Sequence, residues 1–331
     1  MQKVDDMNYA VEVNNLSFFY PGSGKPALRN INLRFEKGKI TTIIGPLGAG
    51  KTTLILTLNG LIPKVIVGKI EGEVVVDGLK VSQHSVSEMA THVGIVFDDP
   101  SLQIISSTVK EDVAFGPANL GLPREEVIKR IKYALERTRL LGFEHRNPRT
   151  LSGGEQQALA IAGIIAMLPK VIVMDEPITM LDPVGKDRVL STIKELNEKY
   201  GYTIILTDSG INIEEISEIT HHMIALYKGE VVKEGKPEEI LTDRNLLKTM
   251  KFKPPQITEL ALKMKRPLFK STPVTLDEAL KSLNTKELEK IRFRRLHKKH
   301  IKEKHMRKPI IIVKNLHHVY PGPPKVEALR G

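Results

Sequence analysis

The chain has 331 residues, more than one average domain needs, and 41% of them are apolar, which is enough for a sizeable core. Cysteine is absent, so disulfides, thiolate chemistry and zinc–thiolate sites are excluded. No apolar run reaches about 18 residues and the first residues carry no apolar signal segment, so we expect any membrane link to go through a partner protein.

Short apolar runs alternate with helical stretches through roughly the first 240 residues. The runs are continuous and rich in β-branched residues, which suits strands buried on both faces of a parallel sheet. We therefore predict an α/β fold. The predicted strands are 40–44, 171–174 and 203–206, and predicted helices begin at Lys51, Ser152 and Pro183.

A glycine-rich motif follows the first of these strands: residues 45–52 read G-P-L-G-A-G-K-T, which fits G-x-x-x-x-G-K-[ST]. Glycines let backbone N–H groups turn towards phosphates, and the following helix adds its dipole. Lys51 supplies a point charge for the outer phosphates, and Thr52 supplies a hydroxyl for Mg²⁺. We expect Mg-ATP to contact Gly45, Pro46, Leu47, Gly48, Ala49, Gly50, Lys51, Thr52 and Thr53.

Two carboxylates, Asp175 and Glu176, end the predicted strand 171–174. Asp175 would hold Mg²⁺ directly or through water, because this ion prefers oxygen ligands and keeps several waters. Glu176 would polarise the attacking water as a general base. Solvated acids after a strand are common, but the phosphate loop upstream favours the catalytic interpretation.

A second glycine motif opens a predicted helix: residues 151–156 read L-S-G-G-E-Q, with Ser152, Gly153 and Gly154 presenting donors at the helix N-terminus. The motif resembles the signature of the ATP-binding-cassette (ABC) family, which usually has Gln where this chain has Glu155. Its position between the phosphate loop and the acidic strand supports the resemblance. The implied fold is a P-loop NTPase core with a mixed or parallel sheet, an antiparallel β subdomain and a helical subdomain that bears the signature.

The resemblance covers residues 9 to about 240 and implies further roles. Tyr20 matches the aromatic residue that stacks on adenine, and Asp182 lies in the loop that crosses to a partner subunit. In the family each ATP lies between one subunit's phosphate loop and the other's signature. A second ABC ATPase domain, in a homodimer or heterodimer, is therefore the expected partner.

Residues 93–103 and 108–116, with the proline-punctuated tail from Pro237, resemble the ATPases of energy-coupling-factor transporters and of cobalt and nickel importers. The resemblance implies that Gln103–Gly116 contacts a transmembrane subunit. It further implies a peripheral protein on the cytoplasmic face of the membrane that drives uptake of a vitamin or a metal ion. An ordinary surface helix is the alternative for this segment.

Two positions depart from the family. Asp98 stands where the family has Gln. Thr207-Asp208 stands where the family has Thr-His, after the strand that follows the loop containing Asp182. An ionised Asp accepts hydrogen bonds but donates none, so we expect Asp208 to repel the γ-phosphate and to slow hydrolysis. Asp98 could still bind water or Mg²⁺. Glu176, Asp98 and Asp208 are thus the candidate catalytic residues, and Thr52, Asp98 and Asp175 the candidate metal ligands.

The remaining chain divides into three segments. Residues 241–288 suggest a small helical accessory domain, and residues 289–308 a basic linker that carries +8 of the net charge of +11. Residues 313–330 (VKNLHHVYPGPPKVEALR) repeat residues 13–29 (VNNLSFFYPGSGKPALR), so 309–331 resembles the start of a second ABC domain. Without a phosphate loop, this last segment is not expected to form an independent domain.

Two other functions compete with the importer. The basic linker would suit a soluble tandem ABC protein that acts on ribosomes or nucleic acid. A non-catalytic subunit that only binds ATP is the other possibility. The importer-like segment near Gln103 favours transport, and we expect no specific nucleic-acid partner.

Overall fold

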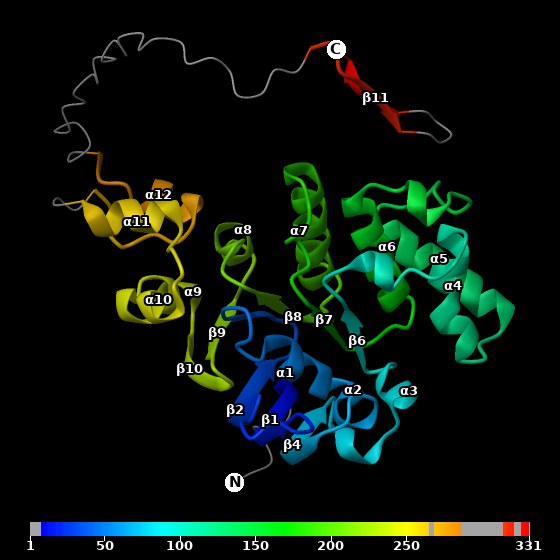
Figure 1. Ribbon diagram of the computed structural model, residues 1–331, viewed down its shortest axis with the longest axis horizontal. Coiled ribbons are helices and arrows are strands. Elements are labelled where there is room, and N and C mark those ends of the chain that lie inside the picture. The colour runs from blue at the N-terminus through cyan, green and yellow to red at the C-terminus, as the bar shows by residue number, and fades with distance from the viewer. Residues whose placement is uncertain (1–7, 265–267, 286–313, 321–325, 331) are drawn as a thin grey trace. The chain divides into compact units, whose positions relative to one another are not determined.

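The computed structural model describes residues 8–264, 268–285, 314–320 and 326–330 (Figure 1). The chain forms two units, residues 1–287 and 288–331. The first unit has the predicted α/β architecture (Figure 1). No helix within the described ranges is long and apolar enough to cross a membrane.

The larger sheet of the first unit has six strands in the order β10-β9-β3-β8-β7-β6. Neighbouring strands are parallel except β10 with β9. The predicted strands at 40–44 and 171–174 are confirmed, and the strand predicted at 203–206 continues to Asp208. The strands are β3 (Ile40–Ile44), β6 (Val93–Val96), β7 (Val171–Met174), β8 (Thr203–Asp208), β9 (His222–Tyr227) and β10 (Glu230–Gly235).

A four-stranded antiparallel sheet has the order β2-β1-β4-β5. Buried and exposed residues alternate along most of β2, as expected for a sheet with one face on the core. Phe18 of β1 lies opposite Leu28 of β2, and both are fully buried. The strands are β1 (Tyr9–Phe19), β2 (Leu28–Glu36), β4 (Lys69–Val76) and β5 (Leu79–Lys80).

Helix α1 begins at Lys51, as predicted, and packs into the core between the two sheets. Leu54, Ile55 and Leu58 of this helix are fully buried there. Short elements connect this region to β6 and beyond: α2 (Leu61–Lys64), η2 (Val81–Gln83), α3 (Val86–Met89) and η3 (Pro100–Leu102).

A helical region follows β6 in the chain and packs beside the strands (Figure 1). Its central helix α6 contacts α7 so closely that a Cβ atom on Gly154 would lie 2.7 Å from the Cα atom of Gly185. Glycine at this point is thus required by helix packing. The elements are α4 (Val109–Asn119), α5 (Arg124–Arg137), η4 (Pro148–Thr150), α6 (Gly153–Ile165) and α7 (Pro183–Glu198).

The predicted accessory segment forms short helices that continue the first unit. Thr275 caps the last of them, because its side chain accepts a hydrogen bond from the Glu278 N–H at 3.2 Å. Phe252 packs against Gly210, where an added Cβ would lie 2.5 Å from the Phe252 ring. The helices of this segment are α10 (Arg244–Met250), α11 (Gln256–Lys263) and α12 (Leu276–Ser282); α8 (Ile213–Ser217) and α9 (Pro237–Leu241) begin before it.

In the second unit, β11 (His317–Tyr320) and β12 (Val326–Arg330) form an antiparallel pair. His318 lies opposite Leu329. By the sequence repeat these positions correspond to Phe18 and Leu28, which are also opposite each other. The predicted linker 289–308 lies outside the described residues.

Candidate nucleotide site

The phosphate loop joins β3 to α1 and needs its glycines. Gly48 and Gly50 have φ values of +75° and +104°, which side chains other than glycine rarely adopt. Gly45 has no room for a side chain, because a Cβ there would lie 2.4 Å from the carbonyl oxygen of Leu226. The backbone therefore reaches the start of α1 in the conformation that the motif predicts.

Lys51 lies at the centre of the site and is only 5% exposed. Its Nζ atom donates a hydrogen bond to the Gly45 carbonyl at 2.8 Å and lies 3.3 Å from Oε1 of Glu176. The ammonium group is thus held by two oxygens, one from the phosphate loop and one from the residue pair after β7. An outer phosphate oxygen is a third acceptor that it can take, because an ammonium has three donors.

Asp175 lies beside Thr52 at the end of β7. Thr52 Oγ1 donates to Asp175 Oδ2 at 2.7 Å, and Thr207 Oγ1 donates to Asp175 Oδ1. Burial raises the pKa of the Asp175 carboxyl, the two hydroxyls oppose this shift, and the nearby Asp98 and Glu176 charges add to it. A cation at this point would offset both the burial and the repulsion.

These oxygens suit a Mg²⁺ ion that is held jointly by the protein, phosphates and waters, rather than by protein side chains alone. In the described part of the chain no group of three or more His, Cys, Asp or Glu is arranged to hold a metal. Mg²⁺ commonly takes one or two protein oxygens together with phosphates and waters. Thr52 and Asp175 can supply those two oxygens.

Glu176 has an unusual backbone for a non-glycine residue, with φ +44°. Its N–H donates to Thr207 Oγ1 at 3.0 Å, which holds this turn. Its Oε2 atom accepts from Thr179 Oγ1 at 3.1 Å and Ser209 Oγ at 3.0 Å. Strained backbone of this kind concentrates at functional sites.

These groups converge on a cavity of about 410 Å³. It brings together most of the predicted phosphate loop with Asp98, Asp175 and Glu176. Tyr20 is not in its lining, but its hydroxyl lies 3.0 Å from Thr53 Oγ1 at the end of the loop. The lining is Leu47, Gly48, Ala49, Gly50, Lys51, Thr52, Thr53, Asp98, Asp175, Glu176, Thr179, Met180, Ser209 and Ile211.

Asp208 does not line this cavity, and the effect of its charge on the phosphates stays a prediction. Its side chain is fully buried and accepts hydrogen bonds from Gly210 N at 2.6 Å and from Asn212 Nδ2 at 3.1 Å. Successive side chains of a strand point to opposite faces. Thr207 faces the carboxylates, so Asp208 at the end of β8 faces away and Ser209 returns to the site.

The signature lies outside this cavity as well. Ser152 caps α6, and its N–H donates to Oε2 of Glu155 at 2.8 Å. Glu155 also pairs with Arg188 at 3.2 Å. Ser152 and Gly153 are exposed, so the Ser152 hydroxyl and the Gly153 N–H face outward where a partner could bind. Asp182 caps α7 by accepting from Gly185 N at 2.7 Å.

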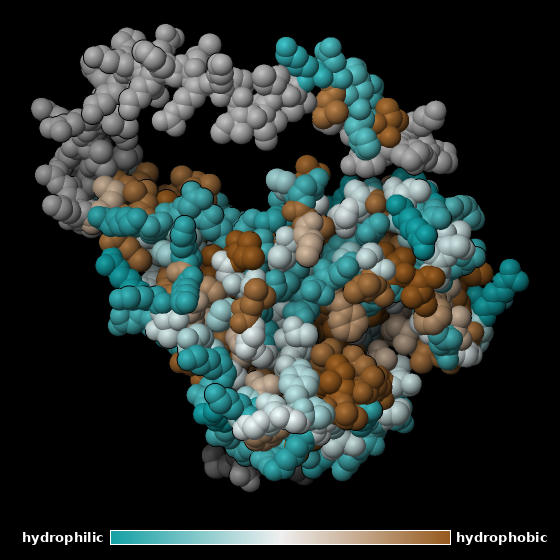
Figure 2. Space-filling view, viewed as in Figure 1, coloured by the Kyte–Doolittle hydropathy of each residue, from teal (hydrophilic) through white to brown (hydrophobic). Residues whose placement is uncertain are grey.

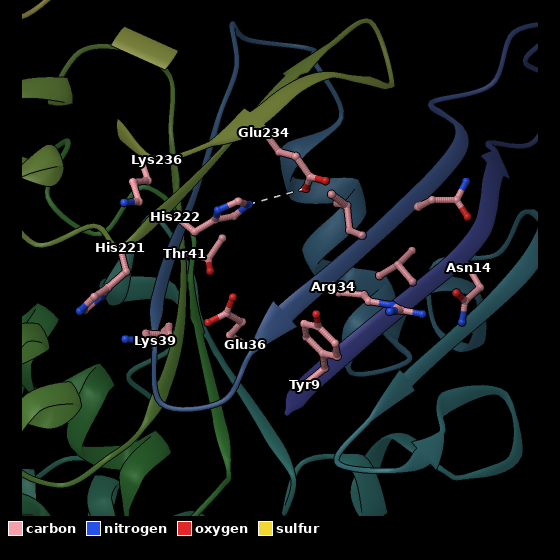
Figure 3. A pocket seen from close by; sticks show the side chains of 13 residues that line it. Tyr9, Asn14, Arg34, Glu36, Lys39, Thr41, His221, His222, Glu234 and Lys236 are labelled. Atoms are coloured by element: carbon pink, nitrogen blue, oxygen red, sulfur yellow. Dashed lines mark ion pairs between the residues drawn. The ribbon is translucent and has the colours of Figure 1, made fainter. Parts of the chain in front are cut away.

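A larger cavity of about 750 Å³ lies at the other end of the parallel strands (Figure 3). Its side chains come from both sheets, with Tyr9 and Arg34 on one side and His221 and Lys236 on the other (Figure 3). His221 lines it, and burial lowers the pKa of this imidazole. Ligands of open α/β sheets bind at the carboxyl ends of strands, whereas this cavity is at the amino ends of β3 and β9.

Fold and site together define a P-loop nucleotide-binding domain. A family model described as "ABC transporter" matches residues 28–179. An ABC transporter ATP-binding protein of Pyrococcus horikoshii is 44% identical over 82% of this chain and 96% of its own length. The energy-coupling factor transporter ATP-binding protein EcfA of Methanocaldococcus jannaschii is 41% identical over 76% of this chain and 88% of its own length.

Further comparisons agree. The structure of cbiO1 from Clostridium perfringens, part of the ABC transporter complex cbiONQ, is 29% identical with a TM-score of 0.65 and covers 78% of this chain and 96% of that chain. One relative is longer: an ABC transporter ATP-binding protein of Caldanaerobacter subterraneus is 40% identical over 81% of this chain but only 47% of its own length. The chain belongs to the ABC transporter family as one of its ATP-binding, ATP-hydrolysing proteins.

Proposed function

We propose that the chain powers a membrane importer of the energy-coupling-factor type, with Mg-ATP bound in the 410 Å³ cavity. The observation that carries this proposal is the convergence of Lys51, Thr52, Asp175 and Glu176 on one cavity beside the phosphate loop. The similarity to EcfA and to cbiO1 supports the type of transporter.

The chemistry follows from the positions of these side chains. Mg²⁺ held by Thr52 and Asp175, with Asp98 within reach of its waters, would neutralise phosphate charge. Lys51 binds the outer phosphates. Glu176 accepts a proton from water as the water oxygen bonds to the γ-phosphorus and the bond to the leaving ADP oxygen breaks. Tyr20, whose hydroxyl lies 3.0 Å from Thr53 Oγ1, would stack on adenine.

A second ABC ATPase domain is the proposed partner at the nucleotide. Four large apolar side chains near the phosphate loop and the start of α7 are strongly exposed: Leu47 (86%), Met180 (83%), Val184 (71%) and Ile211 (70%). Apolar residues gather in patches on the viewed face of the molecule (Figure 2). Exposed apolar groups around a charged site suit a surface that another protein covers. The partner would supply its own Ser and glycines from the signature.

A transmembrane subunit is the proposed partner near 103–116. Leu102, Ile105 and Phe115 are 79%, 61% and 51% exposed in this stretch. Gln103 itself points inward, since its Nε2 donates to the Ile95 carbonyl at 3.0 Å and its Oε1 accepts from the Phe97 N–H at 3.2 Å. The contact would therefore depend on the apolar neighbours of Gln103, and we propose a peripheral location at the cytoplasmic face.

The second unit is proposed to begin a second ABC domain. The repeated sequence and the equivalent pairing of His318 with Leu329 support this assignment. The greater length of the Caldanaerobacter relative agrees with a tandem arrangement. Two domains in one chain would place both partners of the nucleotide site at high effective concentration.

The test is hydrolysis of Mg-ATP by the full chain and by Glu176→Gln, together with identification of membrane proteins that co-purify. We expect turnover in the wild type, near-complete loss in the variant, and co-purification of an integral membrane protein. Salt-sensitive binding to RNA or DNA without a membrane partner would favour the soluble alternative. ATP binding without turnover in the assembled complex would favour a regulatory subunit.

A further inference from the structure

The catalytic carboxylate is held by two hydroxyl groups from different segments. Thr179 Oγ1 and Ser209 Oγ both lie within 3.1 Å of Glu176 Oε2. Thr179 follows β7, and Ser209 follows β8. A carboxylate with its second oxygen fixed in this way keeps Oε1 directed to the side of Lys51, 3.3 Å away.

Asn212 joins the two segments that carry these hydroxyls. Its side chain is fully buried. Its Nδ2 donates to Thr179 Oγ1 and to Asp208 Oδ2, each at 3.1 Å, and its Oδ1 accepts from Lys186 Nζ at 2.6 Å. All the hydrogen-bonding groups of this buried amide are therefore used, which fixes its orientation.

Asp208 completes the arrangement by shaping the turn that carries Ser209. Its Oδ1 accepts from Gly210 N at 2.6 Å and from Asn212 N at 3.4 Å. The tight turn needs Gly210, which has φ +90° and contacts the Phe252 ring. These contacts hold the turn so that Ser209 Oγ reaches Oε2 of Glu176 at 3.0 Å.

We propose that Ser209 and Asn212 are positioning residues for ATP hydrolysis, which act by fixing the carboxylate of Glu176. The inference rests on the proposed role of Glu176 as general base. Neither residue contacts the reacting atoms in this account. A buried, fully bonded polar network of this kind specifies one geometry and loses it when one member is removed.

The test uses Ser209→Ala in the full chain, measured as turnover number and as ATP affinity. Loss of one hydrogen bond to a charged group is expected to lower kcat about tenfold, or about 1.4 kcal/mol, while ATP affinity stays within about twofold. Ser209→Thr keeps the hydroxyl and should restore most of the rate. Ser191→Ala is the matched control, because Ser191 is exposed on α7 and its hydroxyl donates to the Asp187 carbonyl at 2.6 Å, away from Glu176.

Asn212→Ala should lower kcat at least as far as Ser209→Ala, with its melting temperature measured to confirm folding. The inference is overturned if Ser209→Ala keeps the wild-type kcat, if it loses ATP affinity as much as rate, or if Ser209→Thr is no better than Ser209→Ala. Glu176→Gln separates this from the proposed function: unchanged turnover in Glu176→Gln defeats the general-base role itself, whereas loss there with an unaffected Ser209→Ala defeats only the positioning role.

Discussion

The two ends of the parallel strands differ in a way that cavity size alone would misjudge. At the amino ends lies a cavity of about 750 Å³, whose charged side chains Lys39, Glu36 and Lys236 are exposed. The nucleotide cavity at the carboxyl ends is smaller, about 410 Å³, but Lys51 and Asp175 are each only 5% exposed and hydrogen-bonded. Desolvated charges that are held by neighbours, rather than volume, mark the chemical site.

The sharpest test of this difference replaces one lysine with alanine at each end of the strands. Lys51→Ala removes the buried ammonium from the phosphate loop, so we expect ATP affinity to fall at least about 100-fold, or about 2.7 kcal/mol. Lys39→Ala removes an exposed ammonium from the larger cavity and should leave ATP affinity unchanged. Equilibrium binding of a fluorescent ATP analogue measures both, and similar affinities for the two variants would contradict the assignment.

A second test asks whether the carboxyl end is as tightly built as the distances indicate. In Gly45→Ala the new Cβ would meet the Leu226 carbonyl at 2.4 Å and Ala49 Cβ at 2.9 Å. The backbone must shift, so we expect a loss of about 1–3 kcal/mol in unfolding free energy and weaker ATP binding. Gly24→Ala, with nothing within 4 Å of its Cβ, is the control and should be neutral or slightly stabilising. Urea unfolding gives both values.

The same comparison explains which parts of the site the sequence predicts. The phosphate loop and the Asp175–Glu176 pair are contiguous motifs on correctly predicted strands, so their place at one sheet edge follows from local pattern. The direction of the Asp208 side chain does not follow from the motif, because neighbouring side chains of a strand point to opposite faces. Ser209 belongs to no recognised motif. Because side-chain direction alternates along a strand, Thr207 facing the site would have indicated that Ser209 faces it too.

The network beneath the site could not be predicted for a different reason. Asn212 and Thr179 are 33 residues apart and contact each other only because β7 and β8 are adjacent in the sheet. Asn212 stands in no catalytic pattern, and its burial depends on tertiary packing. The same holds for Phe252, which reaches Gly210 from the accessory helices.

A third test exploits the buried charge at the carboxyl end. Burial raises the pKa of Asp208, opposed by hydrogen bonds from Asn212 and Gly210 and reinforced by Glu176. A raised pKa in the folded state means that the stabilising contribution is full below the ordinary Asp range, near pH 4, and is lost as the pH rises through the folded value. Asp208→Asn cannot ionise, so it should lack this loss.

The measurement is the melting temperature of wild type and Asp208→Asn from about pH 4 to pH 8, across the ordinary aspartate range and above it. We expect the wild type to lose stability relative to the variant as the pH rises. The hydrogen bond that Asn212 Nδ2 makes to Asp208 is disturbed in the variant at every pH, so it affects the offset between the curves and not their divergence. Parallel curves would mean that Asp208 titrates as in the unfolded chain.

The smallest effect of a substitution on stability is expected at the amino ends of the strands, where the charged side chains are exposed. His222 and Glu234 approach to 3.7 Å, with 37% and 50% of their side chains exposed (Figure 3). Water screens such a pair, so Glu234→Gln should change the unfolding free energy by less than about 0.5 kcal/mol. ATP affinity should also stay unchanged, because the pair lies at the opposite end of the strands from Lys51. A loss of more than about 1 kcal/mol, or a change in ATP affinity, would show that the large cavity is coupled to the nucleotide site and that the contrast between the two ends is too simple.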